Sequence, residues 1–212
     1  MELKGLTINF LGDSITAGSG TSDWENKTFL ALLGKNEGAT VRNYGVGGSR
    51  IARQLGVSEF IGGECDFVMR EEEMERDADI IVVFGGTNDY GHGNVRFGTM
   101  SDRDVYTFYG ATHTLIQNLM EHNPSATIVF MTPLHRLEEA AHDGKPCLRE
   151  YRNAIKEVCE YYSIPVLDLY AVGGMQPHVE VQRNLYMPDG LHPNDLGHEI
   201  ICSRLTGFLK SL

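Results

Sequence analysis

Several features are scarce or missing in this chain of 212 residues, and each absence excludes a class of protein. The chain has four cysteines and no CxxC pair, so we expect free, mostly buried thiols rather than a disulfide framework. These cysteines are Cys65, Cys147, Cys159 and Cys202. No segment approaches the ~20 consecutive apolar residues of a membrane helix, so we expect no insertion into a membrane.

Excess positive charge is missing as well. The formal net charge of −11 at pH 7 argues against nucleic acid or an anionic membrane surface as a partner. Residues 1–4 lead directly into a strand-like segment, without the apolar region and small-residue cleavage site of a secretory signal. This beginning and the scattered cysteines predict a cytoplasmic protein, whose oligomeric state these features leave open.

Short apolar runs alternate with helical periodicity along the chain. The runs, which predict strands, lie at 6–11, around Val41, at 79–84, at 126–132 and at 164–169. The sequence IIVVF within the third run is unbroken and mostly β-branched, as in strands buried on both faces of a parallel sheet. Between the runs, residues at steps of three and four predict helices. They are Val105, Phe108, Thr112, Leu115 and Leu119, then Leu148, Tyr151, Ile155, Val158 and Tyr162, and finally Ile201, Leu205 and Phe208.

This alternation predicts an α/β fold, a three-layer α/β/α sandwich around a five-stranded parallel sheet. The expected strand order is the flavodoxin-like 2-1-3-4-5. No internal repeat, low-complexity tract or linker interrupts the chain, so residues 1–212 are expected to form a single domain. In open sheets of this kind, ligands bind beyond the carboxyl ends of the strands.

Four short motifs lie where this fold places its ligands. They are GDSIT at 12–16, NYGVGG at 43–48, GTND at 86–89 and DGLHP at 189–193. The first three follow predicted strands, and the fourth precedes the last predicted helix. Together they supply a serine, a histidine, a carboxylate and several N–H donors. Acyl transfer through a covalent serine ester needs these groups.

The four motifs, in this order, resemble the SGNH family of GDSL-type esterases and lipases (acylhydrolases). The resemblance extends from residue 12 to residue 193, and all four motifs match. The one departure is Ile15, where the family's name-giving motif usually has leucine, and it exchanges one apolar residue for another. The resemblance implies the SGNH hydrolase fold and a reaction that requires no cofactor and no metal.

The resemblance also assigns roles to individual residues. Ser14 would be the nucleophile, His192 the base that activates it, and Asp189 the carboxylate that orients the histidine. The oxyanion hole would consist of the backbone N–H groups of Ser14 and Gly48 and the side chain of Asn88. The neighbouring Asp89 is expected to be structural and to hold its loop.

Each motif also has an ordinary structural interpretation. Asp13 or Ser14 could cap a helix, and Asp189 could cap the last helix and leave His192 on the surface. The glycines could form a tight turn, and Asn88 could be a turn residue. The catalytic interpretation is favoured because it explains all four motifs at once.

The segments beside the motifs are expected to shape a substrate pocket. Residues 91–103 follow Asn88, and residues 172–187 precede Asp189. Three aromatic residues lie near the motifs in sequence and are candidates to line the pocket, with ordinary core or surface positions as the alternative. They are Trp24, Tyr90 and Tyr186.

Other polar clusters are given structural interpretations. His192, Asp195 and His198 match neither the HExxH motif nor a Cys/His zinc pattern. The acidic run at 71–73 is expected to be a solvated helix face.

We therefore expect a serine ester hydrolase that cleaves carboxylic esters of short-chain acyl or acetyl groups through an acyl-serine intermediate. Its substrate would be a small-molecule ester, and acetylated sugars, short-chain lipid esters and acyl thioesters all stay open. One alternative is a thioesterase with the same machinery. Another is a metal-dependent phosphoesterase using Asp13, Asn88 and His192, although an Asp-x-His metal motif is missing. The third is a non-catalytic binding protein, against which the complete catalytic set argues.

Overall fold

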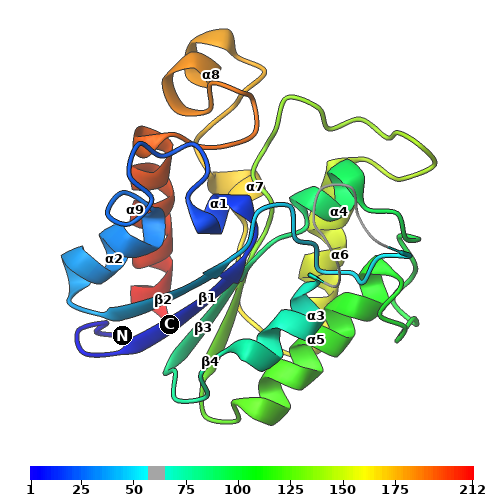
Figure 1. Ribbon diagram of the computed structural model, residues 1–212, viewed down its shortest axis with the longest axis horizontal. Helices are drawn as coiled ribbons and strands as arrows, with labels where there is room; N and C mark the ends of the chain where they lie inside the picture. The colour runs from blue at the N-terminus through cyan, green and yellow to red at the C-terminus, as the bar shows by residue number, and fades with distance from the viewer. Residues whose placement is uncertain (57–64) are drawn as a thin grey trace.

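A computed structural model describes residues 1–56 and 65–212 of the chain. At its centre is a parallel sheet of five strands in the order β2-β1-β3-β4-β5, which confirms the predicted order (Figure 1). The strands are β1 (Thr7–Gly12), β2 (Thr40–Gly45), β3 (Ile80–Phe84), β4 (Thr127–Met131) and β5 (Val166–Leu167). The last strand is shorter than the apolar run that predicted it.

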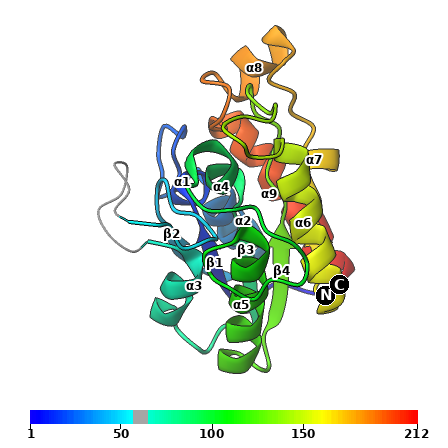
Figure 2. The same ribbon diagram turned by 90° about the vertical axis from the view of Figure 1, so that its right-hand side faces the viewer.

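Helices cover both faces of the sheet, so the three-layer prediction is also confirmed (Figures 1 and 2). The α-helices are α1 (Ser14–Ala17), α2 (Phe29–Glu37), α3 (Phe67–Arg70), α4 (Thr87–His92), α5 (Phe108–His122), α6 (Leu148–Tyr161), α7 (Leu169–Val172), α8 (Glu180–Tyr186) and α9 (Asp195–Ser211). A short 3₁₀ helix, η1 (Glu71–Glu73), follows α3.

The central strand β3 is covered by helices on both faces of the sheet, which explains its unbroken apolar sequence. All five of its residues are buried. Ile81 and Val83 belong to the core formed with α3, α5 and α6. Ile80, Val82 and Phe84 belong to the core formed with α2 and α9. Since successive side chains of a strand point to opposite faces, a strand between two layers of helices is apolar at every position.

The boundaries of α5 differ from the periodic pattern at one end. Thr107 is the N-cap, and its hydroxyl accepts a hydrogen bond from the N–H of Gly110. The helix therefore begins at Phe108, and Val105 lies in the preceding turn rather than in the helix. The helix ends at His122, and Asn123 is the C-cap. The first residue of this helix is therefore determined by the capping hydroxyl of Thr107 and not by the apolar spacing.

The acidic run at η1 is solvated, as the sequence predicted, at Glu72 and Glu73 but not at Glu71. Glu71 is fully buried. Its carboxylate pairs with Arg76 at 2.9 Å and with Nδ1 of His122 at 3.1 Å. These partners, one of them 51 residues away, satisfy a charge that would otherwise be costly to bury.

The helix α8 stands apart from the sheet. None of its residues is buried, and both ribbon views show it projecting beyond the carboxyl ends of the strands (Figures 1 and 2). Because it buries no apolar stripe, α8 has no periodic pattern for a sequence analysis to detect.

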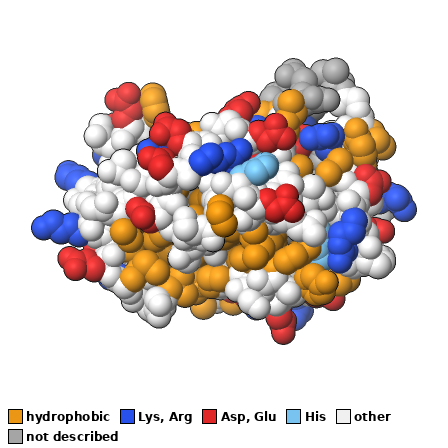
Figure 3. All heavy atoms as spheres, turned by 90° about the horizontal axis from the view of Figure 1, so that it is seen from below, with side chains coloured by type: hydrophobic (Ala, Val, Ile, Leu, Met, Phe, Trp, Pro, Cys, Tyr) orange, Lys and Arg blue, Asp and Glu red, His pale blue; other side chains and the backbone are white. Residues whose placement is uncertain are grey.

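Acidic and basic side chains are interspersed on the face seen in Figure 3, where hydrophobic side chains gather in a band. No described helix combines the length and apolar character required to cross a bilayer. The four cysteines are free, and two of them, Cys159 and Cys202, are buried, whereas Cys65 and Cys147 are partly exposed.

Candidate active site

Ser14 is the first residue of α1, directly beyond the carboxyl end of β1. The helix is capped by Asp13, whose carboxylate accepts a hydrogen bond of 3.0 Å from the N–H of Ile15. Capping is therefore the role of Asp13, and the hydroxyl of Ser14 is left for another partner. Burial raises the pKa of the Asp13 carboxyl to about 7, although the Ile15 hydrogen bond opposes the shift.

Ser14, His192 and Asp189 form a continuous hydrogen-bonded chain. Oγ of Ser14 lies 3.0 Å from Nε2 of His192. Nδ1 of the same ring lies 2.6 Å from Oδ2 of Asp189. This is the arrangement in which a base contacts a hydroxyl and a carboxylate orients the base. The structure thus brings together the three residues that the sequence predicted for this function.

Asp189 orients the backbone as well as the ring of His192. Its Oδ1 accepts hydrogen bonds from the N–H groups of Leu191 and His192, at 2.9 and 2.7 Å. Partial burial would raise the pKa of this carboxyl, but the His192 and Leu191 hydrogen bonds outweigh it and hold the pKa below its usual value. The side chain is 55% exposed, so water shares the carboxylate with the imidazole.

A neighbouring loop packs closely against the His192 segment. Gly20 has a φ of +95°, and a Cβ at this position would lie 2.4 Å from the carbonyl oxygen of Pro193. A side chain at residue 20 would therefore push this loop away from the histidine. The loop is also held by Asp195, which accepts hydrogen bonds from the N–H and hydroxyl of Ser22.

Two backbone N–H groups are candidates for an oxyanion hole. Those of Ser14 and Gly48 donate no hydrogen bond to the other described residues. The turn containing Gly48 approaches the serine, since a Cβ on Gly47 would lie 3.9 Å from Cβ of Ser14. Gly48 has a φ of +75°, a left-handed conformation that glycine adopts without strain.

Arg70, which the sequence analysis did not single out, holds this turn against β1. Its guanidinium donates to the carbonyl of Gly12 at 3.1 Å, to Oγ of Ser49 at 3.0 Å and to the carbonyl of Tyr44. The side chain is only 5% exposed. One buried cation thus links the ends of β1 and β2, where two of the four motifs begin.

Asn88 reaches the same turn from α4. Its Nδ2 donates a hydrogen bond of 3.0 Å to the carbonyl of Ser49, next to Gly48. Asp89 holds the following residues, because its carboxylate accepts hydrogen bonds from the N–H groups of Ile51 and Ala52 at 3.0 and 2.9 Å. Burial raises the pKa of Asp89 to about 6, against these hydrogen bonds. Asp89 is therefore structural, as predicted, but it lies in α4 and holds the segment after the Gly48 turn rather than its own loop.

A pocket of about 670 Å³ lies beside α4, whose residues Tyr90 and Gly91 form part of its lining. Most of its lining comes from the loop at 136–143, which follows β4 and contains no motif. The N–H of Leu137 donates to the carbonyl of Gly190 at 2.8 Å. NH1 of Arg136 donates to the carbonyl of Thr87 at 3.1 Å. One loop thus contacts the neighbours of both Asp189 and Asn88. Only its position beyond a strand end could have identified it from sequence.

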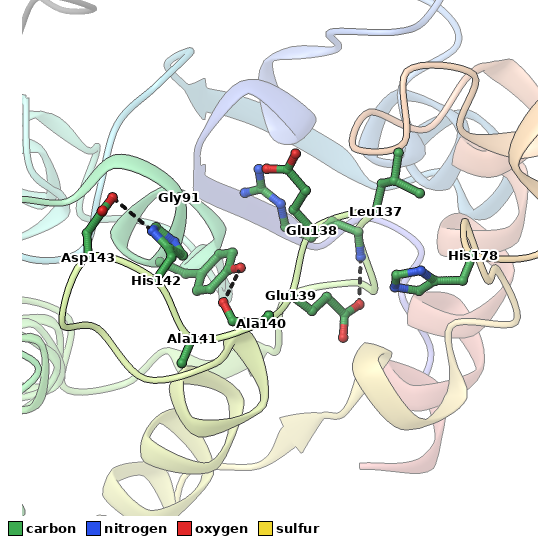
Figure 4. Close-up of a pocket in the computed structure, with 11 residues that line it drawn as sticks. Gly91, Leu137, Glu138, Glu139, Ala140, Ala141, His142, Asp143 and His178 are labelled. Carbon is green, nitrogen blue, oxygen red and sulfur yellow. Dashed lines mark hydrogen bonds and ion pairs between the residues drawn. The ribbon is translucent and has the colours of Figure 1, made fainter.

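Charged and titratable side chains lie among the apolar residues that line this pocket (Figure 4). His142 and Asp143 lie at one end and His178 at the other, with Glu138 and Glu139 between them. Of the segments expected to shape the pocket, 91–103 supplies Gly91 to this one and 172–187 supplies His178. Residues 91–97 line most of a separate pocket of about 620 Å³.

The three aromatic candidates have different positions. Tyr90 lines the pocket but is 2% exposed, and its hydroxyl donates to the carbonyl of Ala140. Tyr186 lines a separate hollow beside α9. Trp24 is a 62% exposed surface residue. For Trp24 the ordinary surface interpretation is therefore the right one.

The residues weighed as metal ligands have other partners. Asp195 pairs with Lys27 at 2.7 Å. Nδ1 of the buried His198 accepts a hydrogen bond of 3.0 Å from the N–H of Phe29. Within residues 1–56 and 65–212, no group of three or more His, Cys, Asp or Glu side chains is arranged to hold a metal ion.

The sequence of this chain matches the model of one known protein family. The model of the "GDSL-like Lipase/Acylhydrolase family" matches residues 10–200. No curated protein matches the chain at a significant level.

Solved structures resemble the chain over its full length. One is 35% identical, with a TM-score of 0.88, and covers 100% of this chain and 99% of its own. A protein from Lactobacillus plantarum is 30% identical, with a TM-score of 0.86 and 98% coverage of each chain. An acetyl xylan esterase is 20% identical, with a TM-score of 0.65, covering 95% of this chain and 98% of its own. The last similarity shows the fold alone.

Proposed function

The chain belongs to the GDSL-like lipase/acylhydrolase family and is an ester hydrolase of this type, and from that premise we propose that it cleaves short-chain acyl esters through an acyl-serine on Ser14. One observation supports this proposal above all others. Oγ of Ser14, both ring nitrogens of His192 and the carboxylate of Asp189 lie in one hydrogen-bonded line, with distances of 3.0 and 2.6 Å.

In the acylation half of the proposed reaction, Oγ of Ser14 attacks the ester carbonyl carbon while Nε2 of His192 takes the hydroxyl proton. The carbonyl π electrons move to the oxygen, which accepts hydrogen bonds from the N–H groups of Ser14 and Gly48 and from Nδ2 of Asn88. When the tetrahedral intermediate collapses, the bond to the alcohol breaks. His192 returns its proton to the leaving alkoxide, and the acyl-serine remains.

Deacylation repeats these steps with water as the nucleophile. His192 takes a proton from the water as its oxygen attacks the acyl carbon. The second tetrahedral intermediate expels Oγ of Ser14, which recovers the proton from His192, and the carboxylic acid leaves. Asp189 stays ionised throughout and stabilises the imidazolium that forms in each half.

Asn88→Ala should lower kcat by roughly 10²–10³ and change KM much less. The variant removes a hydrogen bond that strengthens as the carbonyl oxygen becomes an oxyanion, whereas the ground-state ester uses that bond weakly. Steady-state kinetics on a short-chain ester measures both constants. Folded Asn88→Ala protein with a near-wild-type kcat would show that Asn88 is only a turn residue.

The charged side chains on the walls of the pocket beside α4 support a short acyl group. Burial of each CH₂ contributes about 0.8 kcal/mol only where an apolar wall replaces water. The walls of this pocket carry charged and polar side chains, among them Arg136, Glu138 and Asp143. They suit the polar alcohol part of an ester better than a long alkyl chain. An acetyl ester is also the substrate that the name of the acetyl xylan esterase specifies.

A substrate panel tests this proposal. Among esters and thioesters graded by acyl length and alcohol, acetyl and butyryl esters should have the highest kcat/KM. The Ser14→Ala variant supplies the blank for each substrate. A preference for long acyl chains would contradict the short-chain proposal, and a preference for thioesters would favour the thioesterase alternative.

Extended dialysis against EDTA should leave the activity unchanged. In the proposed mechanism Ser14 and His192 carry out the proton transfers, and Asp189 and neutral N–H donors stabilise the charges that develop. Assays of dialysed protein, with and without added divalent cations, measure this. Activity that disappears and returns with a cation would favour the phosphoesterase alternative.

A further inference from the structure

The side chain of Asn88 is held from two directions. As described above, its Nδ2 donates to the carbonyl of Ser49. Its Oδ1 lies 3.1 Å from Nε2 of His92, one turn further along α4. Nδ1 of the same imidazole lies 3.0 Å from NH1 of Arg50. The result is a chain from Arg50 through His92 and Asn88 to the carbonyl of Ser49.

The chemistry of the two ends determines the direction of every hydrogen bond in this chain. A guanidinium has only donors, so Nδ1 of His92 must accept from Arg50. The neutral imidazole then carries its hydrogen on Nε2 and donates it to Oδ1 of Asn88. A carbonyl has only acceptors, so the group facing Ser49 must be the Nδ2 amide. One hydrogen on Nδ2 satisfies that carbonyl, and the second is left for a ligand.

His92 is suited to this role because it stays neutral. Burial, and then repulsion from Arg50, Lys145 and Arg136, lowers the pKa of its imidazole to about 4. A protonated ring would place a second N–H against the Arg50 guanidinium, so the observed contact favours the neutral form. The tautomer that donates from Nε2 is therefore present throughout the neutral pH range.

We propose that His92 is a positioning residue for the oxyanion hole, which holds the Asn88 carboxamide with its free N–H directed at the developing oxyanion. The proposal rests on the function proposed above. Rotation of a carboxamide by 180° exchanges its oxygen and nitrogen, and the two orientations have nearly the same shape. In the wrong orientation Oδ1 would face the oxyanion and repel it. His92 and Ser49 each oppose that rotation.

The test compares His92→Leu with His92→Gln. Leucine fills the space without a donor, whereas glutamine offers an amide N–H near the position of Nε2. His92→Leu should lower kcat by about 10- to 100-fold, within the range of an orienting contact, with little change in KM. His92→Gln should recover most of that loss. Melting temperatures show that both variants are folded.

A double-mutant cycle identifies the residue through which His92 acts. Once Asn88 is alanine, His92 has no carboxamide to orient, so adding His92→Leu should lower kcat no further. Equal additional losses in both backgrounds would overturn the inference, as would wild-type kcat in folded His92→Leu protein.

The failure of this inference can be told apart from failure of the proposed function. If Ser14→Ala and Asn88→Ala lower kcat as expected but His92→Leu does not, only the positioning role is wrong. If Asn88→Ala has no effect, the oxyanion assignment fails and the positioning role fails with it. If Ser14→Ala keeps its activity, the serine mechanism itself is wrong.

Discussion

Ser14→Ala protein is expected to have a kcat about 10⁶-fold lower than that of the wild type on a short-chain ester. The substitution removes one oxygen atom, Oγ, which the proposed mechanism uses both as nucleophile and as the site of the acyl intermediate. His192→Ala should cost about as much, because the two residues act as a unit. The double variant should be no slower than either single one. Steady-state assays, with long incubations at high enzyme concentration for the variants, measure these decreases in kcat.

Covalent labelling provides an independent measurement of the same serine. A fluorophosphonate should form an adduct on wild-type protein that mass spectrometry locates on Ser14, and Ser14→Ala should form none. Ser14→Ala should melt near the wild-type temperature, since its α1 is capped by Asp13. An adduct located on another residue would refute the assignment of Ser14.

Asp189→Asn should lower kcat by up to about 10⁴-fold, less than the loss expected for Ser14→Ala or His192→Ala. The asparagine can keep its Oδ1 on the N–H groups of Leu191 and His192, so Nδ2 then faces the ring. Nδ1 of His192 must accept from that amide, which leaves the hydrogen on Nε2. A protonated Nε2 cannot take the proton of Ser14. Because Asp189 is 55% exposed, water can replace part of its effect, and 10⁴ is the upper bound.

Asp77→Asn is the matched control for this substitution. Asp77 is a 68% exposed carboxylate that pairs with Arg42 and lies before β3, at the amino end of that strand. The same change of charge there should leave kcat unaltered. If Asp189→Asn also keeps a near-wild-type kcat, Asp189 only holds the backbone of its turn.

The sequence predicted most of the sheet because a strand that is buried on both faces consists of consecutive apolar residues. The run IIVVF has an apolar residue at every position, as two layers of helices require. The motifs were equally informative, because each follows a strand or precedes α9 and all reach the same end of the sheet. What brings them together is the sheet topology, which the alternation of elements already implied.

The features that were missed depend on partners distant in sequence. The burial of Glu71 depends on Arg76 and on His122, which comes from another helix. Nothing in the run of three glutamates distinguishes a buried carboxylate from solvated ones. The pocket loop is another case, since Arg136 and Leu137 contact segments about 50 residues away in each direction. Their role comes from these contacts and not from a local motif.

The distance along the chain between Ser14 and His192 has a consequence for biosynthesis. The two residues in contact are 178 positions apart. At a translation rate of about 5–20 residues per second, the serine leaves the peptidyl-transferase centre on the order of 10 s before its histidine is made. A nascent chain that has already formed β1, β3 and β4 would still be inert toward esters. In a refolding experiment, the return of catalysis would therefore report the docking of α9 and its preceding turn, and fluorescence or dichroism could recover earlier.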